Sequence, residues 1–280
     1  MMRPFALSGF LLLAGTFLNS NPAAAQIPQL VELADRLARE IKPAKPRLVA
    51  VVDLRPISGA NSSQAHYFSL LLSSILQVQD KKKLKLNVAD HLAFDTDLAH
   101  VHLSADALIP GDSLNASAGH IGADLLIVGT LEKRGNSYVL QLNPVRTASS
   151  ETLAPLSSTF ESNEFFESLF LPLPSDVPSL SRQTQPGSQK GASMPSCIRC
   201  PDPSYTDLAR RARINGTDVF QVLISAEGEA KQIRPMKLIG YGLDEQAFST
   251  IKKWRFKPAT NKDGTPVPVV VPVEVTFRLY

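Results

Sequence analysis

The sequence predicts an α+β protein: an N-terminal α/β sandwich with a mixed sheet, a flexible linker, and a small C-terminal α+β domain with two helices and a three-stranded antiparallel sheet. Between residues 27 and 172, helical spacing of apolar residues alternates with short β-branched runs, as in interleaved helices and strands. Residues 173–196 are rich in Pro, Ser, Gln and Gly and cannot bury enough apolar surface to offset the entropy lost on ordering. Residues 197–280 follow the order helix, strand, strand, helix, strand.

The first 25 residues have the pattern of a secretory signal peptide. Arg3 precedes an apolar run over residues 5–18, and Ala23 and Ala25 supply the small residues of a cleavage site. The run covers about 14 residues, which is short against the roughly 20 that span a bilayer. We therefore expect cleavage after Ala25 and a periplasmic protein. The alternative is an inner-membrane protein that keeps residues 1–25 as an anchor and faces the periplasm.

Composition and charge limit the function classes. The 280 residues are 44% hydrophobic and 20% charged, as in a soluble globular protein. Residues 26–172 carry thirteen Lys and Arg against sixteen Asp and Glu, whereas residues 173–280 carry fifteen against ten. The basic excess of the C-terminal part favours an acidic partner but lacks the density of a nucleic-acid-binding face, so we expect no nucleic acid.

The N-terminal part is predicted to begin with an amphipathic helix and to end with a β-hairpin. Apolar residues recur at three and four positions from Leu30 to Ile41, and Pro43 ends that helix. Residues 134–136 separate two alternating runs and form the hairpin turn. The elements expected in between and at the end are strand 47–54, helix 66–79, strand 84–90, helix 113–122 and the hairpin over residues 123–146.

The C-terminal part is predicted to contain two helices and three strands. Ser204 and Asp207 have the spacing of a capping box, and Gly216 marks the end of the first helix. A hairpin turns at residues 226–229. The indole of the second helix is expected to fill the interface between helix and sheet. The apolar face of that helix consists of Leu243, Ala247, Ile251 and Trp254.

The terminal strand, residues 268–280, contains two prolines that a central strand would not tolerate. Because the N–H groups of alternate residues point to opposite edges, Pro268 and Pro272 remove donors from one edge only, and the strand is predicted to lie at the edge of its sheet. Such an edge either docks the strand of a partner or is protected against pairing and binds nothing. The donors left on the open edge, and so the candidate partner-binding residues, are Val270, Glu274, Thr276 and Arg278.

Cys197 and Cys200 are the only cysteines, and their spacing is that of a redox motif or of half a zinc site. A zinc site needs two more ligands, and the nearest histidine in the sequence is His120. Redox catalysis favours a cysteine pair at a helix N-terminus, whereas Pro201 and Pro203 separate this pair from the next helix. We expect a structural disulfide, with a thiol–disulfide protein as the alternative.

No other motif assembles a catalytic or cofactor site. Asp53 follows a hydrophobic strand, where α/β enzymes often place acids, but no base, nucleophile or phosphate loop accompanies it, so it is interpreted as structural. His100 and His102 could bind metal on a strand face, but a solvated loop or helix end is favoured. The lysines at 81–83 predict a solvated turn. We therefore expect no enzymatic activity, no metal and no cofactor.

Several short motifs of the C-terminal part occur in an order that resembles the TonB C-terminal domain. The matching positions are Pro203, Tyr205, Ala209, Arg210, Ile214, Gly216, Gly242, Leu243, Asp244, Ala247 and residues 254–259. The resemblance implies a periplasmic module that hands inner-membrane energy to outer-membrane receptors and binds a short receptor peptide as an added strand. TonB transducers keep an N-terminal helix with a functional histidine, and residues 5–18 contain none. Binding is therefore implied more directly than energy transduction.

The N-terminal part resembles, through RLVAVVDL and GADLLIVGTLEKRGNSYVLQL, the α/β domain of TolB and of the envelope proteins FlgO and CsgG. Taken together, these features predict a non-enzymatic periplasmic protein that binds an outer-membrane TonB-dependent receptor or another envelope protein by strand addition. A second copy of the chain is a further candidate partner through the same edge. The alternatives are an inner-membrane TonB energy transducer and a thiol–disulfide protein.

Overall fold

The computed structural model describes residues 26–83, 86–91, 122–169, 171–172, 175, 177 and 193–279. The signal peptide, His100 and His102, the helix predicted over residues 113–121 and most of the predicted linker lie outside these ranges. The elements of the N-terminal part are α1 (Gln26–Ile41), η2 (Lys42–Ala44), β1 (Val49–Val51), β2 (Arg55–Ile57), α2 (Ser62–Lys83), β3 (Leu125–Arg134), β4 (Ser137–Arg146), β5 (Leu156–Glu161) and α5 (Glu164–Ser168).

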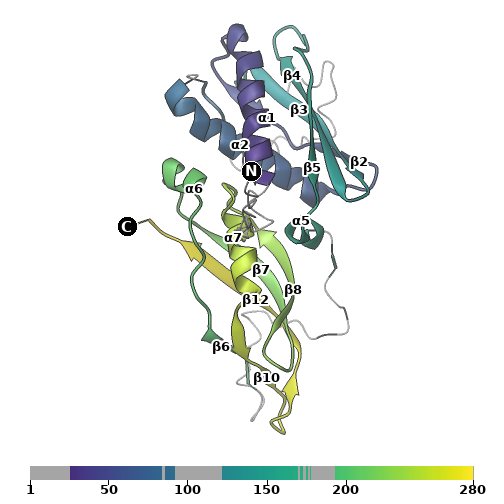
Figure 1. Ribbon diagram of the computed structural model, residues 1–280, viewed down its shortest axis with the longest axis vertical. Helices are drawn as coiled ribbons and strands as arrows, with labels where there is room; N and C mark the ends of the chain where they lie inside the picture. The colour runs from purple at the N-terminus through teal and green to yellow at the C-terminus, as the bar shows by residue number, and fades with distance from the viewer. Residues whose placement is uncertain are drawn as a thin grey trace, which may run out of the picture.

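The N-terminal part is a mixed sheet with helices packed on it, as the sequence predicts. Strands β3, β4 and β5 are antiparallel neighbours, while β1 and β2 both pair in parallel with β3. Helices α1 and α2 lie beside each other against the sheet (Figure 1). The apolar stripe predicted for α1, from Leu30 to Ile41, is buried in this layer. The sandwich therefore forms because one helical stripe and one sheet face cover each other.

An aromatic cluster fills the space between α2, the sheet and α5. The rings of Phe68 and Phe166 stack with their centroids 4.8 Å apart, and Tyr138 contacts both rings. The amide nitrogen of Gln64 donates to the hydroxyl of Tyr138 at 2.6 Å and to the carbonyl of Phe166 at 3.1 Å. These hydrogen bonds satisfy polar groups that would otherwise be buried without a partner.

Three expectations for the N-terminal part need correction. Of the strand predicted over residues 84–90, the described part, residues 86–90, forms only an isolated parallel bridge between Val88 and Val49. The lysines at 81–83, predicted to form a turn, continue α2, which reaches Lys83 because lysine is a good helix former. Strands β2 and β5 and helix α5 were not predicted, since each is too short to show a clear period in the sequence.

The C-terminal part contains the predicted helix–strand–strand–helix–strand order with short additional strands. Its elements are β6 (Ser196–Arg199), α6 (Asp207–Ala212), β7 (Gly216–Ile224), β8 (Ala230–Lys237), α7 (Leu243–Ile251), β9 (Arg255–Lys257), β10 (Ala259–Thr260), β11 (Pro266–Val267) and β12 (Val269–Phe277). Strands β12, β7 and β8 form a three-stranded antiparallel sheet in that order, which confirms the predicted fold class. Strand β6 pairs with β9, and β10 pairs with β11.

The helix boundaries in the C-terminal part differ from the predicted ones. Thr206, not Ser204, caps α6, because its hydroxyl accepts a hydrogen bond from the N–H of Ala209. The helix ends at Ala212, and the next residue, Arg213, adopts a left-handed conformation with φ of 55° before Gly216 starts β7. Trp254 lies beyond the end of α7 rather than on its apolar face, although it is buried as expected.

The N-terminal and C-terminal parts share one continuous hydrophobic core. Phe165 on α5 packs edge-on against Phe248 on α7, with ring centroids 5.4 Å apart. Lys252 at the end of α7 forms an ion pair with Glu164 at the start of α5. In Figure 1, α7 lies against the C-terminal sheet, and α5 lies where the two parts meet. None of the helices in the described ranges is long and apolar enough to cross a membrane.

Candidate functional site

Strand β12 lies at one end of the C-terminal sheet, where the sequence places the partner-binding edge. It pairs with β7 over its whole length, from Val269 opposite Ile224 to Phe277 opposite Gly216. No second neighbour of β12 occurs among the described strands. The end of β12 leads to the C-terminus at the left of the view in Figure 1. One edge of the strand therefore has no described strand beside it.

The hydrogen bond of a residue just beyond the end of β12 indicates which edge of the strand each N–H group faces. The N–H of Leu279 donates to the side-chain oxygen of Asn215, just before β7, at 2.8 Å. Because backbone groups alternate between edges, the odd-numbered residues of β12 direct their N–H groups to β7 and the even-numbered residues direct theirs away. Pro272, opposite Gln221, is even-numbered and so costs the sheet no hydrogen bond.

The opposite end of the sheet is protected in the same way. Pro235 on β8 pairs with Phe220 on β7, an even-numbered residue whose own N–H points to β12. The missing N–H of Pro235 is therefore on the outer side of β8. Both outer strands carry a proline at a position that leaves the internal hydrogen bonds intact, which limits pairing along the full length of either edge.

The four predicted partner-binding residues have different environments. The side chain of Val270 is buried, at 2% exposure, although the alternation of the strand predicts that it points outward. Glu274, Thr276 and Arg278 have exposed side chains. The hydroxyl of Thr276 lies 3.0 Å from that of Thr217 on β7, so these hydroxyls link the two strands on the outer face. The accessible part of the edge is thus the end nearest the C-terminus.

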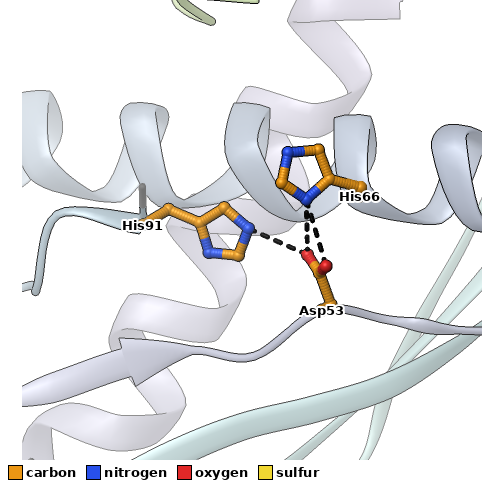
Figure 2. Close-up of side chains that lie close together, drawn as sticks. All are labelled: Asp53, His66 and His91. Carbon is orange, nitrogen blue, oxygen red and sulfur yellow. Dashed lines mark hydrogen bonds and ion pairs between the residues drawn. The ribbon is translucent and has the colours of Figure 1, made fainter. Parts of the chain in front are cut away.

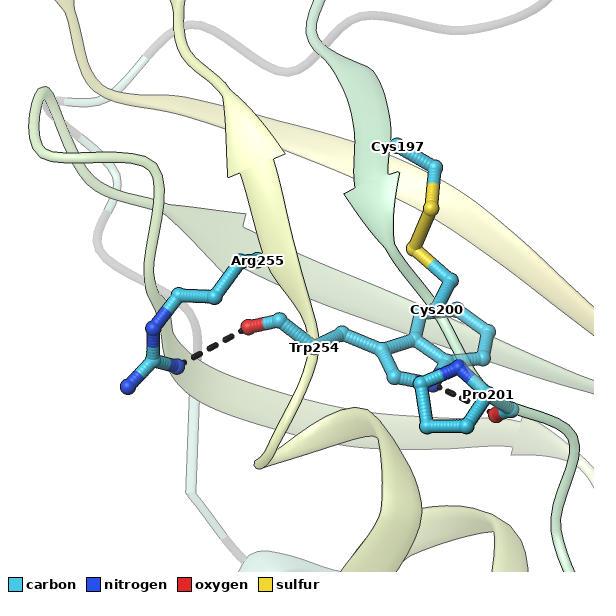
Figure 3. Close-up of a disulfide and its surroundings, with 5 residues drawn as sticks. All are labelled: Cys197, Cys200, Pro201, Trp254 and Arg255. Atoms are coloured by element: carbon cyan, nitrogen blue, oxygen red, sulfur yellow. Dashed lines mark hydrogen bonds between the residues drawn. A yellow bond between two sulfur atoms is a disulfide. The ribbon is translucent and has the colours of Figure 1, made fainter.

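Cys197 and Cys200 are joined by a disulfide at the strand that leads into the sheet region (Figure 3). Cys197 pairs with Phe256 across β6 and β9, and the indole N–H of Trp254 donates to the carbonyl of Pro201 at 2.9 Å. The next helix begins only at Asp207, so no helix N-terminus lies at the cysteines to favour a thiolate. The pairing of β6 with β9 and the indole hydrogen bond attach the incoming chain to this region, and the disulfide closes a short loop within that chain.

A group of buried acids holds the loop before α7. Asp244 accepts hydrogen bonds from the N–H groups of Ile239 at 2.7 Å and Gly240 at 3.0 Å, and Asp218 on β7 also accepts one from Ile239. Burial raises the pKa of Asp218 to about 7, and burial together with the charge of Asp218 raises the pKa of Asp244 well above its ordinary value. Burial and the neighbouring Asp244 raise the pKa of Glu245 to about 8. The burial of these carboxyls was not predicted, because acidic residues in a first helical turn, such as Asp244 and Glu245, are ordinarily exposed and Asp218 lies far from them in the sequence.

Asp53, interpreted from the sequence as structural, lies beside two histidines that the sequence did not connect with it. Asp53, His66 and His91 form a group of side chains whose ligand atoms lie within 4.8 Å of one another. These are the residues of the described ranges that could hold a metal ion. The Asp53 position was recognisable from the strand before it, but its partners lie on other elements and leave no local pattern.

The C-terminal part matches a known family. Residues 201–279 match the family model described as Gram-negative bacterial TonB protein C-terminal. The chain is also similar to Protein TonB of Vibrio cholerae serotype O1, with 34% identity over 80 residues, which cover 28% of this chain and 32% of that protein. The match thus spans about a third of the length of that curated relative.

The solved structures that the chain matches include a TonB C-terminal domain and an LpoB C-terminal domain. The Pseudomonas aeruginosa TonB C-terminal domain matches with 21% identity and a TM-score of 0.27, covering 30% of this chain and 86% of that one. The LpoB C-terminal domain from Salmonella enterica matches with 13% identity and a TM-score of 0.36, covering 48% of this chain and 97% of that one. TM-scores this low add nothing to the assignment, which depends on the sequence match. At residues 201–279, the chain matches the family model of the TonB C-terminal domain and is similar in sequence to a TonB protein.

Proposed function

We propose that this chain is a periplasmic binding protein that takes up an extended segment of an envelope partner along the outer edge of β12. The observation that best supports this function is the position of β12 at the end of the sheet, with the N–H groups of even-numbered residues directed outward. An extended peptide that adds to such an edge gains main-chain hydrogen bonds, and side chains beside the edge supply specificity.

The partner of this edge is a short extended peptide of an outer-membrane receptor. Arg278 directly follows the end of β12 and is exposed, and the exposed side chain of Leu279 adjoins it. A peptide with an acidic residue followed by an apolar one would complement this pair by charge and by contact. A second copy of β12 could occupy the same edge, which would make the protein a dimer.

The N-terminal part serves as a carrier for the binding domain in this proposal. Residues 27–172 form an α/β envelope-type domain, residues 173–196 a linker and residues 197–280 the binding domain, with residues 1–25 removed on export. The ion pair between Glu164 and Lys252 and the contact of Phe165 with Phe248 support a docked arrangement of the two domains. N-terminal sequencing of the native protein distinguishes a released protein from an anchored energy transducer.

Hydrogen–deuterium exchange with synthetic peptides from outer-membrane receptors of the same organism tests the proposal. Binding at the edge should slow the exchange of residues 276–278 and leave β8, at the other end of the sheet, unchanged. Unchanged exchange at residues 276–278 for every peptide that binds would contradict strand addition. Two measurements distinguish a dimer from a peptide complex. Sedimentation analysis of the protein without peptide shows whether it forms a dimer. If exchange at the edge slows as the protein concentration rises without peptide, a second copy occupies the edge.

A further inference from the structure

A carboxylate and two imidazoles meet in the N-terminal part, far along the chain from the candidate edge. Asp53 follows β1, His66 lies in the first turns of α2, and His91 follows the segment that bridges β1 at Val88. Nδ1 of His66 lies 3.0 Å from both oxygens of Asp53, and Nε2 of His91 lies 2.9 Å from Oδ1 (Figure 2). Three separate segments therefore direct nitrogen and oxygen atoms to one point.

The contact of Nδ1 of His91 shows which nitrogen of this ring is available to a metal ion. Nδ1 of His91 lies 2.9 Å from the carbonyl oxygen of Val51, and a carbonyl can only accept, so Nδ1 carries a proton. Nε2 then faces a carboxylate oxygen. The side chain of His91 is only 1% exposed, and with Nδ1 engaged by the carbonyl, Nε2 is the nitrogen that it directs toward Asp53 and that could bind a metal ion.

We propose that Asp53, His66 and His91 form a binding site for one divalent transition-metal ion of the zinc type. Two imidazole nitrogens and a carboxylate oxygen are ligands that Zn²⁺ prefers, and a protein site with three ligands leaves a fourth position for water or another group. A hydrogen bond from the second imidazole nitrogen to a backbone carbonyl, as from His91 to Val51, is the usual support of a metal-bound histidine.

The spacing of the ligand atoms approaches what this ion needs. With metal–ligand bonds of about 2.0–2.1 Å and tetrahedral angles, ligand atoms lie roughly 3.3 Å apart. The contacts of Asp53 with the two imidazoles measure 2.9 and 3.0 Å, so each must lengthen by less than about half an ångström. All three ligand atoms lie within 4.8 Å of one another, and binding would bring the two imidazole nitrogens to the same separation of roughly 3.3 Å. His66 has a side chain 34% exposed, which gives an ion a path from solvent. The metal would tie β1, α2 and the segment around His91 together.

Titration calorimetry with zinc on the full chain, stripped by a chelator and with its disulfide intact, tests the site. We expect one zinc ion per chain, and each of Asp53→Asn, His66→Gln and His91→Gln should weaken binding by at least about tenfold. The double variant His100→Gln/His102→Gln is the matched control and should bind zinc as the unchanged chain does. Titration with Co²⁺ gives a second readout, because a tetrahedral site with nitrogen and oxygen ligands yields intense visible absorption bands.

If the His91 variant fails to fold because His91 is buried, His66→Gln tests the metal site by itself. His66 is partly exposed, so its replacement should leave the circular dichroism spectrum unchanged. Absence of zinc binding by the unchanged chain at millimolar zinc would overturn the proposal. Undiminished binding by the His66 variant, or binding lost only in the double control, would do so as well. In either case, the three side chains form a hydrogen-bonded cluster that holds no metal.

Discussion

The hydroxyl of Tyr241, just before α7, donates a hydrogen bond of 2.6 Å to Oε1 of Gln77 on α2, although the two residues are 164 positions apart. Gly240 lies next to Tyr241 and against Leu70 and Ser74 of the same helix. Leu70, Ser74 and Gln77 follow the spacing of one helical face. Helix α2 thus covers the N-terminal sheet with one face and receives the loop before α7 with another, which explains why both parts share one core.

Gly240 brings the backbone of this loop against α2. It adopts φ of +84°, and an added Cβ would lie 2.9 Å from Oγ of Ser74 and 3.1 Å from Cγ of Leu70. Gly240→Ala should therefore add about 1–3 kcal/mol of overpacking to the cost of the left-handed conformation. Gly264→Ala is the control, since Gly264 has φ of +86° but no atom within 4 Å of the added Cβ, and it should cost only about 1–2 kcal/mol. Urea unfolding of both variants measures the difference, and equal losses would show that the loop yields without cost.

The terminal strand could be predicted in detail because its signal is local. Pro268 and Pro272 share one parity, and parity alone states which edge of a strand loses its donors. The register of β12 against β7 agrees with that reading. The burial of Val270 was not predicted. The alternation of apolar residues along a strand predicts which side chains face the core of the sheet, but it does not show which segments cover the other face.

Contacts between distant segments could not be predicted in the same way. Nothing in the sequence around Asp53 indicates His66 or His91, because the three residues meet only after α2 has packed on the sheet. The docking of the two parts was missed for a similar reason. Tyr67 and Leu70 have the apolar character of any core-facing helical residue, so the sequence does not tell which layer each of them contacts.

Because the buried acids have raised pKa values, we expect the free energy of unfolding to fall as the pH rises. Glu245, with an ordinary pKa of 4.5, has one of about 8 in the folded protein, and Asp218 has one of about 7. Above the ordinary value, the folded state therefore binds more protons than the unfolded state, and the free energy of unfolding decreases until the pH passes these raised values. We expect Glu245→Gln to change stability little at pH 5 and to raise it by roughly 2–5 kcal/mol at pH 8.5.

Urea unfolding of the unchanged chain and of the Glu245 variant, at a series of pH values, checks this expectation. The measurement at pH 5 serves as the internal control, because the carboxyl is protonated there and the amide replaces it in size and in hydrogen-bonding capacity. A stability difference that does not grow between pH 5 and pH 8.5 would show that Glu245 titrates close to its ordinary pKa.

The disulfide should stabilise the fold modestly and should have no thiol–disulfide exchange activity. A bridge between Cys197 and Cys200 closes a very short loop, so its removal should cost no more than about 2 kcal/mol. The double variant Cys197→Ser/Cys200→Ser should therefore fold, with a lower melting temperature, and keep its affinity for receptor peptides. A standard disulfide-reduction assay should show no activity above background for the unchanged chain. Substantial activity that disappears in the double variant would instead support the thiol–disulfide alternative.

Thr276 offers the sharpest test of the outward edge of β12. Thr276→Pro removes an N–H that points away from β7 and places the proline ring where a partner strand would lie, as Pro272 already does further along the strand. Thr276→Val is the matched control, because it also loses the hydroxyl contact with Thr217 but keeps the N–H. Loss of one backbone hydrogen bond costs about 0.5–1.5 kcal/mol, and the ring adds a steric clash, so receptor peptides should bind the proline variant at least about tenfold more weakly than the valine variant.

Both variants should retain the amide exchange protection of β7, since no bond of the internal sheet is removed. Equal peptide affinities of the two variants would mean that the partner binds elsewhere, whereas loss of protection in β7 of the proline variant alone would mean that Thr276 directs its N–H inward.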